Sequence, residues 1–342
     1  MKNYKTFFKN KTLLITGGTG SIGNAIIDYF IKNKINLLKI IIYSRDEWKQ
    51  YEMERKYKFK HNQDLRFYLG DVRDKERLLR AMYKVDIVIH AAALKQVDKA
   101  ENEPMEAIKT NIFGAQNVID CCLQTTVSNV IALSTDKASS PINLYGATKL
   151  CSDKLFISAN NVKGPKNIKF SVVRYGNVLN SRGSVLPLFK KQMKESYFTI
   201  TDLKMTRFLI TLNESVELIL HSIIKSLGSE IFIPKLKSFK IVDLAKSLKK
   251  DAKFKIIGIR PGEKLHEELI SKDDSTKVIE LKNLYILTNP FIEKNRPIKF
   301  IEKFYGGKKI NKEFIYNSYE NLNFHNTSSL TKILKNLDLD KI

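Results

Sequence analysis

The stretch TLLITGGTGSIG, residues 12–23, decides the fold of this chain. Its first five residues are apolar or β-branched and predict a short buried strand, Thr12–Thr16. Glycines in the pattern G-x-x-G-x-x-G follow, and the helical period of Ser21–Lys32 begins within them. Glycines let the chain turn sharply beneath a pyrophosphate, and a helix N-terminus attracts its negative charge. The residues expected to cradle a dinucleotide are Gly17, Thr19, Gly20, Ser21, Ile22 and Gly23.

Further short apolar runs follow and alternate with segments of helical period. This alternation is typical of α/β proteins with a doubly wound, parallel Rossmann sheet. The predicted strands are 39–43, 66–69, 86–90, Asn129–Leu133 and Lys169–Val173.

The alternation weakens after Asn177, where we expect a smaller C-terminal substrate-binding domain. There we predict a helix over 213–227 capped by Asn213, strands over 230–233 and 255–259, and a helix Ile241–Leu248. The tail beyond Ser275 is polar, and we expect it to be irregular. The predicted division gives residues 10–180 to the nucleotide-binding domain, with 206–235 returning to it, and 181–205 and 236–342 to the substrate-binding domain and tail.

Composition excludes several classes of protein. The net charge of +23 comes from 59 basic and 36 acidic residues. The basic residues are spread along the chain without an Arg-rich helix or a basic block with interleaved aromatics, so we predict no specific nucleic-acid binding. The charge instead favours a polyanionic small substrate, such as a nucleotide diphosphate.

Cysteine usage and hydropathy indicate the compartment. Cys121, Cys122 and Cys151 are odd in number and lack metal-ligand spacing, so a disulfide framework is not expected. We see no signal peptide and no apolar run of the roughly 20 residues that a membrane span needs. We therefore expect a cytoplasmic protein without membrane association. The histidines form no ligand cluster, and we predict no metal.

The end of the second strand indicates the cofactor. Sites that prefer NAD place an acidic residue there, whereas Ser44 and Arg45 stand at this position. A hydroxyl and a guanidinium suit a 2′-phosphate, so NADP is predicted. Asp46 follows and leaves NAD as the alternative. Further predicted cofactor contacts are Asp71 and Val72 at the adenine, and Ala91, Ala92 and Ala93 at the nicotinamide ribose.

A candidate catalytic group follows the fifth strand. Tyr145 and Lys149 form Y-x-x-x-K, and residues four apart share one face of a helix. Lys149 can then lie beside the ribose and, with the nicotinamide charge, lower the pKa of the Tyr145 phenol so that it works as a base. Thr135, ten residues earlier, can supply a hydroxyl to the substrate oxygen.

Long segments of the chain resemble the extended short-chain dehydrogenase/reductases, and more narrowly the inverting UDP-N-acetylglucosamine 4,6-dehydratases. The resemblance covers residues 14–270 and weakens beyond Ser275. Its segments are ITGGTGSIG, IYSRDEWKQ, GDVRD, HAAALKQV, ALSTDKASSPINLYGATKL, VVRYGNVLNSRGSV, ITDLKMTRF and GIRPGEKLHE.

The pair Asp136-Lys137 distinguishes branches of this family. Retaining dehydratases typically carry Asp-Glu at these positions, with the glutamate as base. The lysine after the aspartate resembles the pattern of the inverting enzymes. The structural alternative is that Asp136 and Lys137 form a solvated ion pair at a strand end.

The resemblance implies a hydro-lyase that removes water and inverts C5, giving UDP-2-acetamido-2,6-dideoxy-L-arabino-hex-4-ulose. NADP, tightly held, would carry hydride from C4 to C6 and be regenerated in each cycle. Tyr145 would take the 4-hydroxyl proton, Lys137 in its neutral form the C5 proton, and Asp136 in its protonated form would donate to the departing 6-hydroxyl. We expect a lowered pKa for Lys137, because cations and partial burial would disfavour its charge.

The resemblance also implies the substrate contacts. Arg260 suits a diphosphate and Glu263 suits ribose hydroxyls. The other expected contacts are Lys95, Asn177, Val185, Thr201 and Met205, with Arg207 as a candidate or a structural ion pair. His90 is predicted to be structural.

Alternative functions remain open at this point. A retaining dehydratase or a 4-epimerase shares the dinucleotide site and Tyr145, and a non-catalytic dinucleotide-binding regulator shares the fold. The resemblance implies a homo-oligomer, a dimer or larger, and a role in pseudaminic acid or surface-polysaccharide synthesis without deciding between them.

Overall fold

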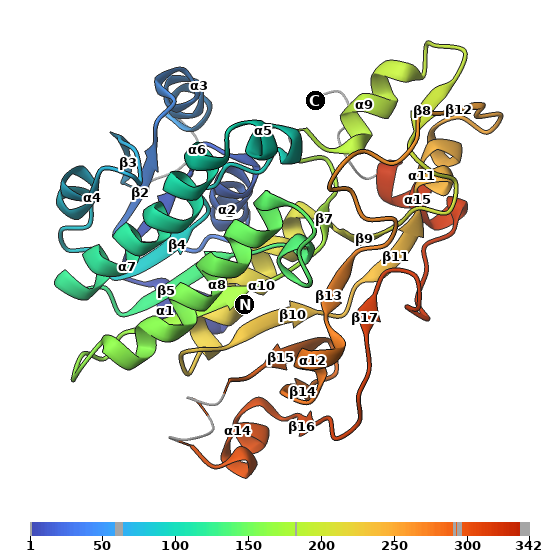
Figure 1. Ribbon diagram of the computed structural model, residues 1–342. Coiled ribbons are helices and arrows are strands. Elements are labelled where there is room, and N and C mark those ends of the chain that lie inside the picture. The colour runs from blue at the N-terminus through green and yellow to red at the C-terminus, as the bar shows by residue number, and fades with distance from the viewer. Residues whose placement is uncertain (1, 59–63, 182, 290–291, 293–295, 336–342) are drawn as a thin grey trace.

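A ten-stranded sheet runs through the centre of the molecule (Figure 1). The computed structural model of the protein describes residues 2–58, 64–181, 183–289, 292 and 296–335. The sheet has the order β16-β14-β15-β10-β6-β5-β4-β1-β2-β3, in which the strands from β3 to β10 pair with one another in parallel and β15 pairs with β10 antiparallel. The parallel strands are β1 (Thr12–Thr16), β2 (Lys39–Ser44), β3 (Leu65–Leu69), β4 (Ile87–His90), β5 (Asn129–Leu133), β6 (Lys169–Val173) and β10 (Ile231–Pro234). The predicted doubly wound sheet is confirmed.

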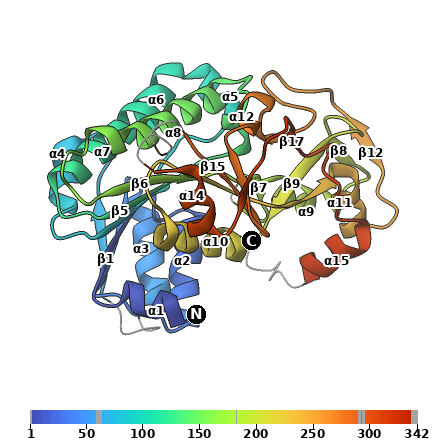
Figure 2. The same ribbon diagram turned by 90° about the horizontal axis from the view of Figure 1, so that it is seen from below.

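Helices cover both faces of this sheet (Figure 2). One face carries α2 (Ser21–Lys32), α3 (Glu47–Tyr57) and α10 (Leu212–Lys225). The other carries α4 (Lys75–Ala81), α5 (Val97–Asn102), α6 (Pro104–Ile108), α7 (Gly114–Gln124) and α8 (Leu144–Val162), with a π-helical turn, Lys109–Phe113, between α6 and α7. A short helix, α1 (Lys2–Phe8), precedes β1. Among the described residues, no helix combines the length and apolarity needed to cross a bilayer.

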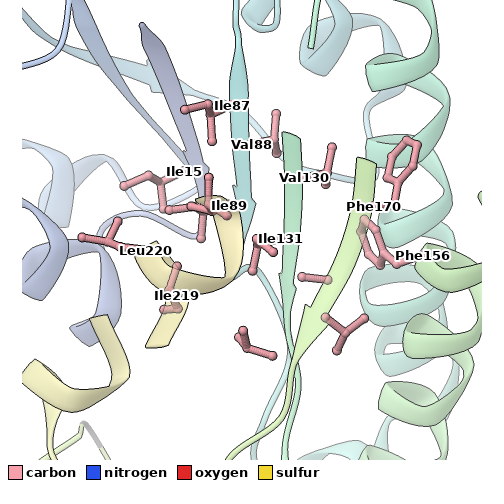
Figure 3. Packing of buried hydrophobic residues seen from close by; sticks show 14 of the residues in the cluster. Ile15, Ile87, Val88, Ile89, Val130, Ile131, Phe156, Phe170, Ile219 and Leu220 are labelled. Carbon is pink, nitrogen blue, oxygen red and sulfur yellow. The ribbon is translucent and has the colours of Figure 1, made fainter. Parts of the chain in front are cut away.

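The main core lies between the sheet and these helices (Figure 3). Ile15, Ile89 and Ile131 come from adjacent strands and are buried. Ile219 of α10 packs on one side, and Phe156 of α8 packs on Phe170 on the other. Both faces of β1 are buried, which explains why TLLIT is a continuous run rather than an alternating one.

A second region follows β6 and has its own core around Leu186, Phe198, Phe239 and Leu244. Its strands form three small sheets: β7 (Asn177–Val178) with β9 (Thr206–Ile210) and β11 (Lys237–Lys240), β8 (Phe198–Ile200) with β12 (Phe254–Ile256), and β13 (Glu268–Ile270) with β17 (Tyr316–Asn317). Its helices are α9 (Val185–Gln192), α11 (Ile241–Leu248) and α15 (Thr327–Lys335).

The structure corrects the expected organisation after residue 200. The tail is not irregular: after α12 (Lys272–Ser275) it contains β14 (Val278–Glu280), β15 (Leu284–Leu287), α14 (Ile298–Tyr305) and β16 (Lys308–Lys309). Strands β14 to β16 extend the main sheet, so 236–342 does not all lie with the substrate-binding region. Strand β9 does not join the main sheet, whereas β10 joins it and α10 packs against one of its faces. Residues 336–342 of the predicted tail lie outside the described residues.

Two local boundaries also differ from prediction. The cap of α10 is Thr211 rather than Asn213, because Thr211 and Glu214 form a reciprocal capping box. The strand predicted over 255–259 ends earlier, at Ile256, since Gly258 takes a positive φ of 81° and turns the chain.

A buried ion pair fastens α8 to the end of β6. The Arg174 guanidinium donates to Asp153 Oδ2 at 3.2 Å and to the Leu269 carbonyl at 3.2 Å. The Ser134 hydroxyl donates to the same carboxylate at 2.7 Å. Both charged side chains are buried, so neither can exchange its partner for water.

Substitution of Asp153 by Ala is expected to lower the free energy of unfolding by about 3–5 kcal/mol, because it leaves a buried guanidinium without its counter-charge. Urea denaturation measures this loss. The matched control is the double variant Asp153→Leu with Arg174→Met, which removes both charges and should recover much of the stability. A loss below about 1 kcal/mol in the single variant would contradict the assignment.

Candidate active site

A cavity of about 630 Å³ lies at the carboxyl ends of β1, β2, β4 and β5. This edge of a parallel sheet is where ligands bind in doubly wound folds. The predicted cofactor residues that line it are Gly17, Thr19, Gly20, Ser21, Ile22, Ser44, Arg45, Asp71, Val72, Ala91, Ala92, Ala93, Tyr145 and Lys149.

The glycine turn fits a dinucleotide. Gly17 has a φ of 65°, and its amide donates to the Tyr43 carbonyl at 2.8 Å. A Cβ there would lie 2.8 Å from the Ala92 backbone, so only glycine allows β1 and β4 to converge at the cavity. Gly23 is buried behind this wall, and its Cβ would lie 1.9 Å from the Gly18 carbonyl. Gly23 therefore allows α2 to pack on the turn instead of contacting a ligand, contrary to the prediction.

Positive groups gather where the adenosine half of a dinucleotide would lie. Arg45 is about half exposed, and its guanidinium lies 3.5 Å from Asp71. The Ser44 hydroxyl accepts from the Gln50 amide at 3.1 Å. Asp46 caps α3 by accepting from the Lys49 amide at 2.9 Å and also pairs with the Lys49 ammonium. Although burial raises the pKa of Asp71, hydrogen bonds from Arg73 and the charge of Arg45 bring it below its usual value.

Tyr145 and Lys149 lie on the first turns of α8, which Asn143 caps by accepting from the Gly146 amide at 2.7 Å. The Thr135 side chain is a hydrogen-bond partner of Tyr145. Burial raises the pKa of Tyr145 to about 12 despite the opposing charge of Lys137, and the lowering expected from Lys149 together with the nicotinamide charge stays a prediction. Burial also lowers the pKa of Lys149, against the charge of Asp153.

Asp136 and Lys137 do not form the solvated pair of the structural alternative. Asp136 is 1% exposed, and its Oδ1 accepts from Thr135 Oγ1 at 3.0 Å and from Lys137 Nζ at 3.1 Å. Lys137 Nζ also donates to Glu267 Oε1 at 2.8 Å. The Arg207 Nε lies 3.7 Å from the same carboxylate oxygen. These four side chains, Asp136, Lys137, Arg207 and Glu267, form a charged cluster at the end of β5.

The charged cluster sets the protonation of its members. Burial raises the pKa of Asp136 and outweighs the charge of Lys137, which is the direction that the expected acid role requires. Burial alone would lower the pKa of Lys137, but Asp136 and Glu267 raise it above its usual value. The predicted lowering is wrong because the lysine lies between two carboxylates rather than beside cations. Burial raises the pKa of Glu267, but the charges of Lys137 and Arg207 bring it below its usual value.

A second cavity of about 320 Å³ adjoins the first, and Lys95, Lys137 and Asn177 line both. It contains all the predicted substrate contacts: Lys95, Asn177, Val185, Thr201, Met205, Arg260 and Glu263. Arg260 lies 3.3 Å from Glu263 at the outer wall. Arg207 lies 3.5 Å from Glu263 as well, so both readings of Arg207, ion pair and cavity lining, describe its position.

His90 has the structural position predicted for it. It is buried, with Nδ1 2.8 Å from Thr16 Oγ1, and its ring packs on Phe156. Burial lowers its pKa to about 3, so the ring is neutral. Within the described residues no group of His, Cys, Asp or Glu side chains has the arrangement of a metal site, and His61 lies outside them.

Sequence reasoning missed Glu267. It stands in the segment GIRPGEKLHE that carried the resemblance, but only Arg260 and Glu263 received roles there. The available signal was a pair of acidic residues, Glu267 and Glu268, before the buried residues Leu269 and Ile270 of β13. Its partner Lys137 is 130 positions away, and no local pattern connects the two.

Comparisons with known proteins agree with this geometry. The sequence matches the family described as polysaccharide biosynthesis protein over residues 13–289. It is 50% identical over 336 residues to the UDP-N-acetylglucosamine 4,6-dehydratase (inverting) of Campylobacter jejuni, covering 97% of this chain and 99% of that protein. It is 44% identical over 310 residues to a UDP-glucose 4-epimerase of Rickettsia conorii, covering 89% of each.

A solved structure is similar over the same length. Pen from Bacillus thuringiensis superposes with a TM-score of 0.87 at 36% identity, covering 97% of this chain and 99% of that chain. Fold, site and sequence thus coincide along almost the entire chain. The protein belongs to the polysaccharide biosynthesis protein family, within the extended short-chain dehydrogenase/reductases that include the inverting UDP-N-acetylglucosamine 4,6-dehydratases.

Proposed function

We propose that the protein is a hydro-lyase: an NADP-dependent UDP-N-acetylglucosamine 4,6-dehydratase that inverts C5. The observation that carries the proposal is the position of Asp136 and Lys137. They lie beside Tyr145 at the junction of a dinucleotide-type cavity and a second, smaller cavity. The relative from Campylobacter jejuni, 50% identical over almost the whole chain, bears the name of this activity.

The first cavity would hold the dinucleotide. The glycine turn and the N-terminus of α2 suit its pyrophosphate, and Ala91 to Ala93 leave room for the ribose. When bound, the nicotinamide supplies a hydride acceptor at C4 of the sugar and a hydride donor at C6. Arg45 and Lys49 line the cavity near Ser44, whereas Asp46 is engaged by Lys49 and by the cap of α3. This arrangement supports NADP over NAD.

The catalytic side chains divide the proton transfers among them. Tyr145, held by Thr135, accepts the proton of the 4-hydroxyl. Asp136 is buried with a raised pKa and donates its proton to the departing 6-hydroxyl. Lys137 removes the proton from C5, which the ketone at C4 has made acidic. An amine can do this only after losing its own proton, so the charged cluster must provide an acceptor.

The second cavity would take the UDP-sugar. Arg260 and Lys95 offer positive charge to the diphosphate, and Glu263 accepts from ribose hydroxyls. Asn177 lines both cavities, where the sugar would meet the nicotinamide. Burial lowers the pKa of Lys95, and an anionic ligand beside it would raise this pKa again.

A second candidate, UDP-glucose 4-epimerase, is favoured by the Rickettsia relatives that bear this name. An epimerase needs the dinucleotide and Tyr145 but no acid for a 6-hydroxyl and no base at C5. The buried, hydrogen-bonded Asp136 and Lys137 therefore favour the dehydratase.

We also propose that the protein works in the cytoplasm as a homo-oligomer, dimeric or larger, on the basis of the family resemblance. Sedimentation velocity would test the oligomeric state.

Incubation with UDP-N-acetylglucosamine and NADP⁺ in D₂O is expected to give a product lighter by one water, with deuterium at C5 and inverted configuration there. Mass spectrometry and NMR of the product measure both. An epimerase would instead leave the mass unchanged. Retention at C5, or a product without deuterium at that carbon, would contradict the proposed elimination.

Replacement of Lys137 by Ala is expected to lower kcat by about 10²–10⁴-fold, because the C5 base is lost. KM for the UDP-sugar should change much less, since Arg260 and Glu263 remain. Steady-state kinetics measure the split. Lys154→Ala, which removes an exposed lysine of α8 that lines neither cavity, is the control expected to stay near wild type. Normal dehydration by the Lys137 variant would remove this lysine from the base role.

Replacement of Arg45 by Ala is expected to weaken NADP⁺ binding about tenfold or more while NAD⁺ binding changes little, because only NADP carries the 2′-phosphate. Fluorescence titration with the reduced forms measures both dissociation constants. Arg73→Ala is the matched control, since Arg73 also binds Asp71 but does not line the cavity. Equal effects of Arg45→Ala on the two cofactors would contradict the NADP preference.

A further inference from the structure

Glu267 faces the proposed C5 base from the C-terminal part of the chain. It lies directly before β13 and is 1% exposed. Its Oε1 accepts from Lys137 Nζ at 2.8 Å, and this is shorter than the 3.1 Å between Lys137 Nζ and Asp136 Oδ1. Its Oε2 is buried without a hydrogen-bond partner. The oxygen that holds the lysine is therefore also the one to which a proton on Nζ can pass, and no described group donates to the other oxygen.

The position of Lys137 poses a chemical problem for the proposed function. A lysine can remove a proton from carbon only as a neutral amine. Between two buried carboxylates the ammonium form is favoured, and its proton must leave before C5 is attacked. Asp136 cannot take that proton if it enters the reaction protonated as the acid. The remaining hydrogen-bonded acceptor of Lys137 is Glu267.

We propose that Glu267 is the positioning residue of the base: it orients the Lys137 amine and takes its proton, so that the C5 base is a lysine–glutamate pair. The proposal rests on the dehydratase function and deepens it. The proton moves from Nζ to Glu267 along the existing hydrogen bond, leaving a neutral amine and a neutral acid. The amine then takes the C5 proton as Asp136 protonates the departing 6-hydroxyl. The C5–H and C6–O bonds break, a C5–C6 double bond forms, and water leaves.

The charge of Arg207 influences the protonation of both Lys137 and Glu267. Its Nε lies 3.7 Å from Glu267, and it is itself held by the carbonyls of Thr206 and Leu265 at 2.8 and 3.0 Å. Its positive charge stabilises the anionic form of Glu267 until the substrate is in place. The same charge disfavours the positively charged ammonium form of Lys137. The other titratable groups that act on the pair are Asp136, Tyr145 and Lys264.

A segment near the C-terminus holds Glu267 in place. Ser318, directly after β17, is fully buried, and its amide donates to the Glu267 carbonyl at 2.8 Å. The Glu267 amide donates to Ser318 Oγ at 3.0 Å, and the same hydroxyl lies 2.7 Å from Thr206 Oγ1. One serine thus fixes Glu267 and the residue before Arg207. Figure 1 shows β13 and β17 side by side at this point.

The test is Glu267→Gln, which keeps the side-chain size but cannot accept the proton. At neutral pH we expect kcat to fall by about 10²–10⁴-fold with little change in KM for the UDP-sugar. Removal of the carboxylate also lowers the pKa of Lys137, so kcat should rise steeply towards about pH 9 and regain part of the loss. Wild type should show a flat profile over this range, because its proton is transferred internally.

Glu268→Gln is the matched control on the adjacent residue. The Glu268 carboxylate accepts from Ser139 and Ser140 at 3.0 and 2.7 Å, not from Lys137, so this variant should keep the flat profile. If Glu267→Gln fails to fold in thermal unfolding, Glu267→Asp replaces it. The shorter carboxylate should lower kcat but retain the flat profile, because it can still accept a proton.

The outcomes separate this proposal from the function on which it rests. Wild-type dehydration together with a Glu267→Gln variant of unchanged kcat overturns the role of Glu267 alone. The same holds if kcat falls by one factor at every pH, or if both glutamine variants change alike, because either result indicates a structural effect. Absence of dehydration by the wild type overturns both proposals.

Discussion

Parallel strands end at one edge of a sheet, and the hydrogen bonds that keep β1, β4, β5 and β6 in register bring four chain segments together there. The glycine turn follows β1, the alanines follow β4, the turn with Asp136 and Lys137 follows β5, and Asn177 follows β6 after a short connection. None of these segments could form the site alone. The absent side chain of Gly17 permits the close approach of the segments that follow β1 and β4, and both segments line the cavity.

The second constraint is electrostatic. Burial of isolated charges is costly, and the structure meets this cost by burying them in partnered groups. Arg174 and Asp153 fasten α8 to the sheet, whereas Asp136, Lys137, Arg207 and Glu267 lie where the two cavities meet. The first group joins two elements of the fold. The second places acids and bases within hydrogen-bond reach of each other, so a proton can move between them with little motion of heavy atoms.

Local signals explain what the sequence predicted well. Short apolar runs and helical periods predict the parallel strands and α2. Helical spacing predicts that Tyr145 and Lys149 share one face of α8, and Thr135 stands at the end of the preceding strand. Features that depend on distant partners were not predictable in this way. The strands β14 to β16 are only two to four residues long, and they join the main sheet because β15 pairs with β10. The pKa shift of Lys137 was predicted in the wrong direction, because the tertiary fold alone brings its partner Glu267 beside it.

The hydrogen bonds between Ser318 and Glu267 relate the order of synthesis to the order in which the parts of the site can form. The strands β1 to β6 and β10, with the glycine turn and α8, are all complete by Pro234. A chain emerging from a ribosome can therefore form most of the dinucleotide cavity early. The carboxylate that faces Lys137 is fixed only after the segment around Ser318 has been made. A nascent chain would thus be able to form most of its cofactor site before its proton-handling site.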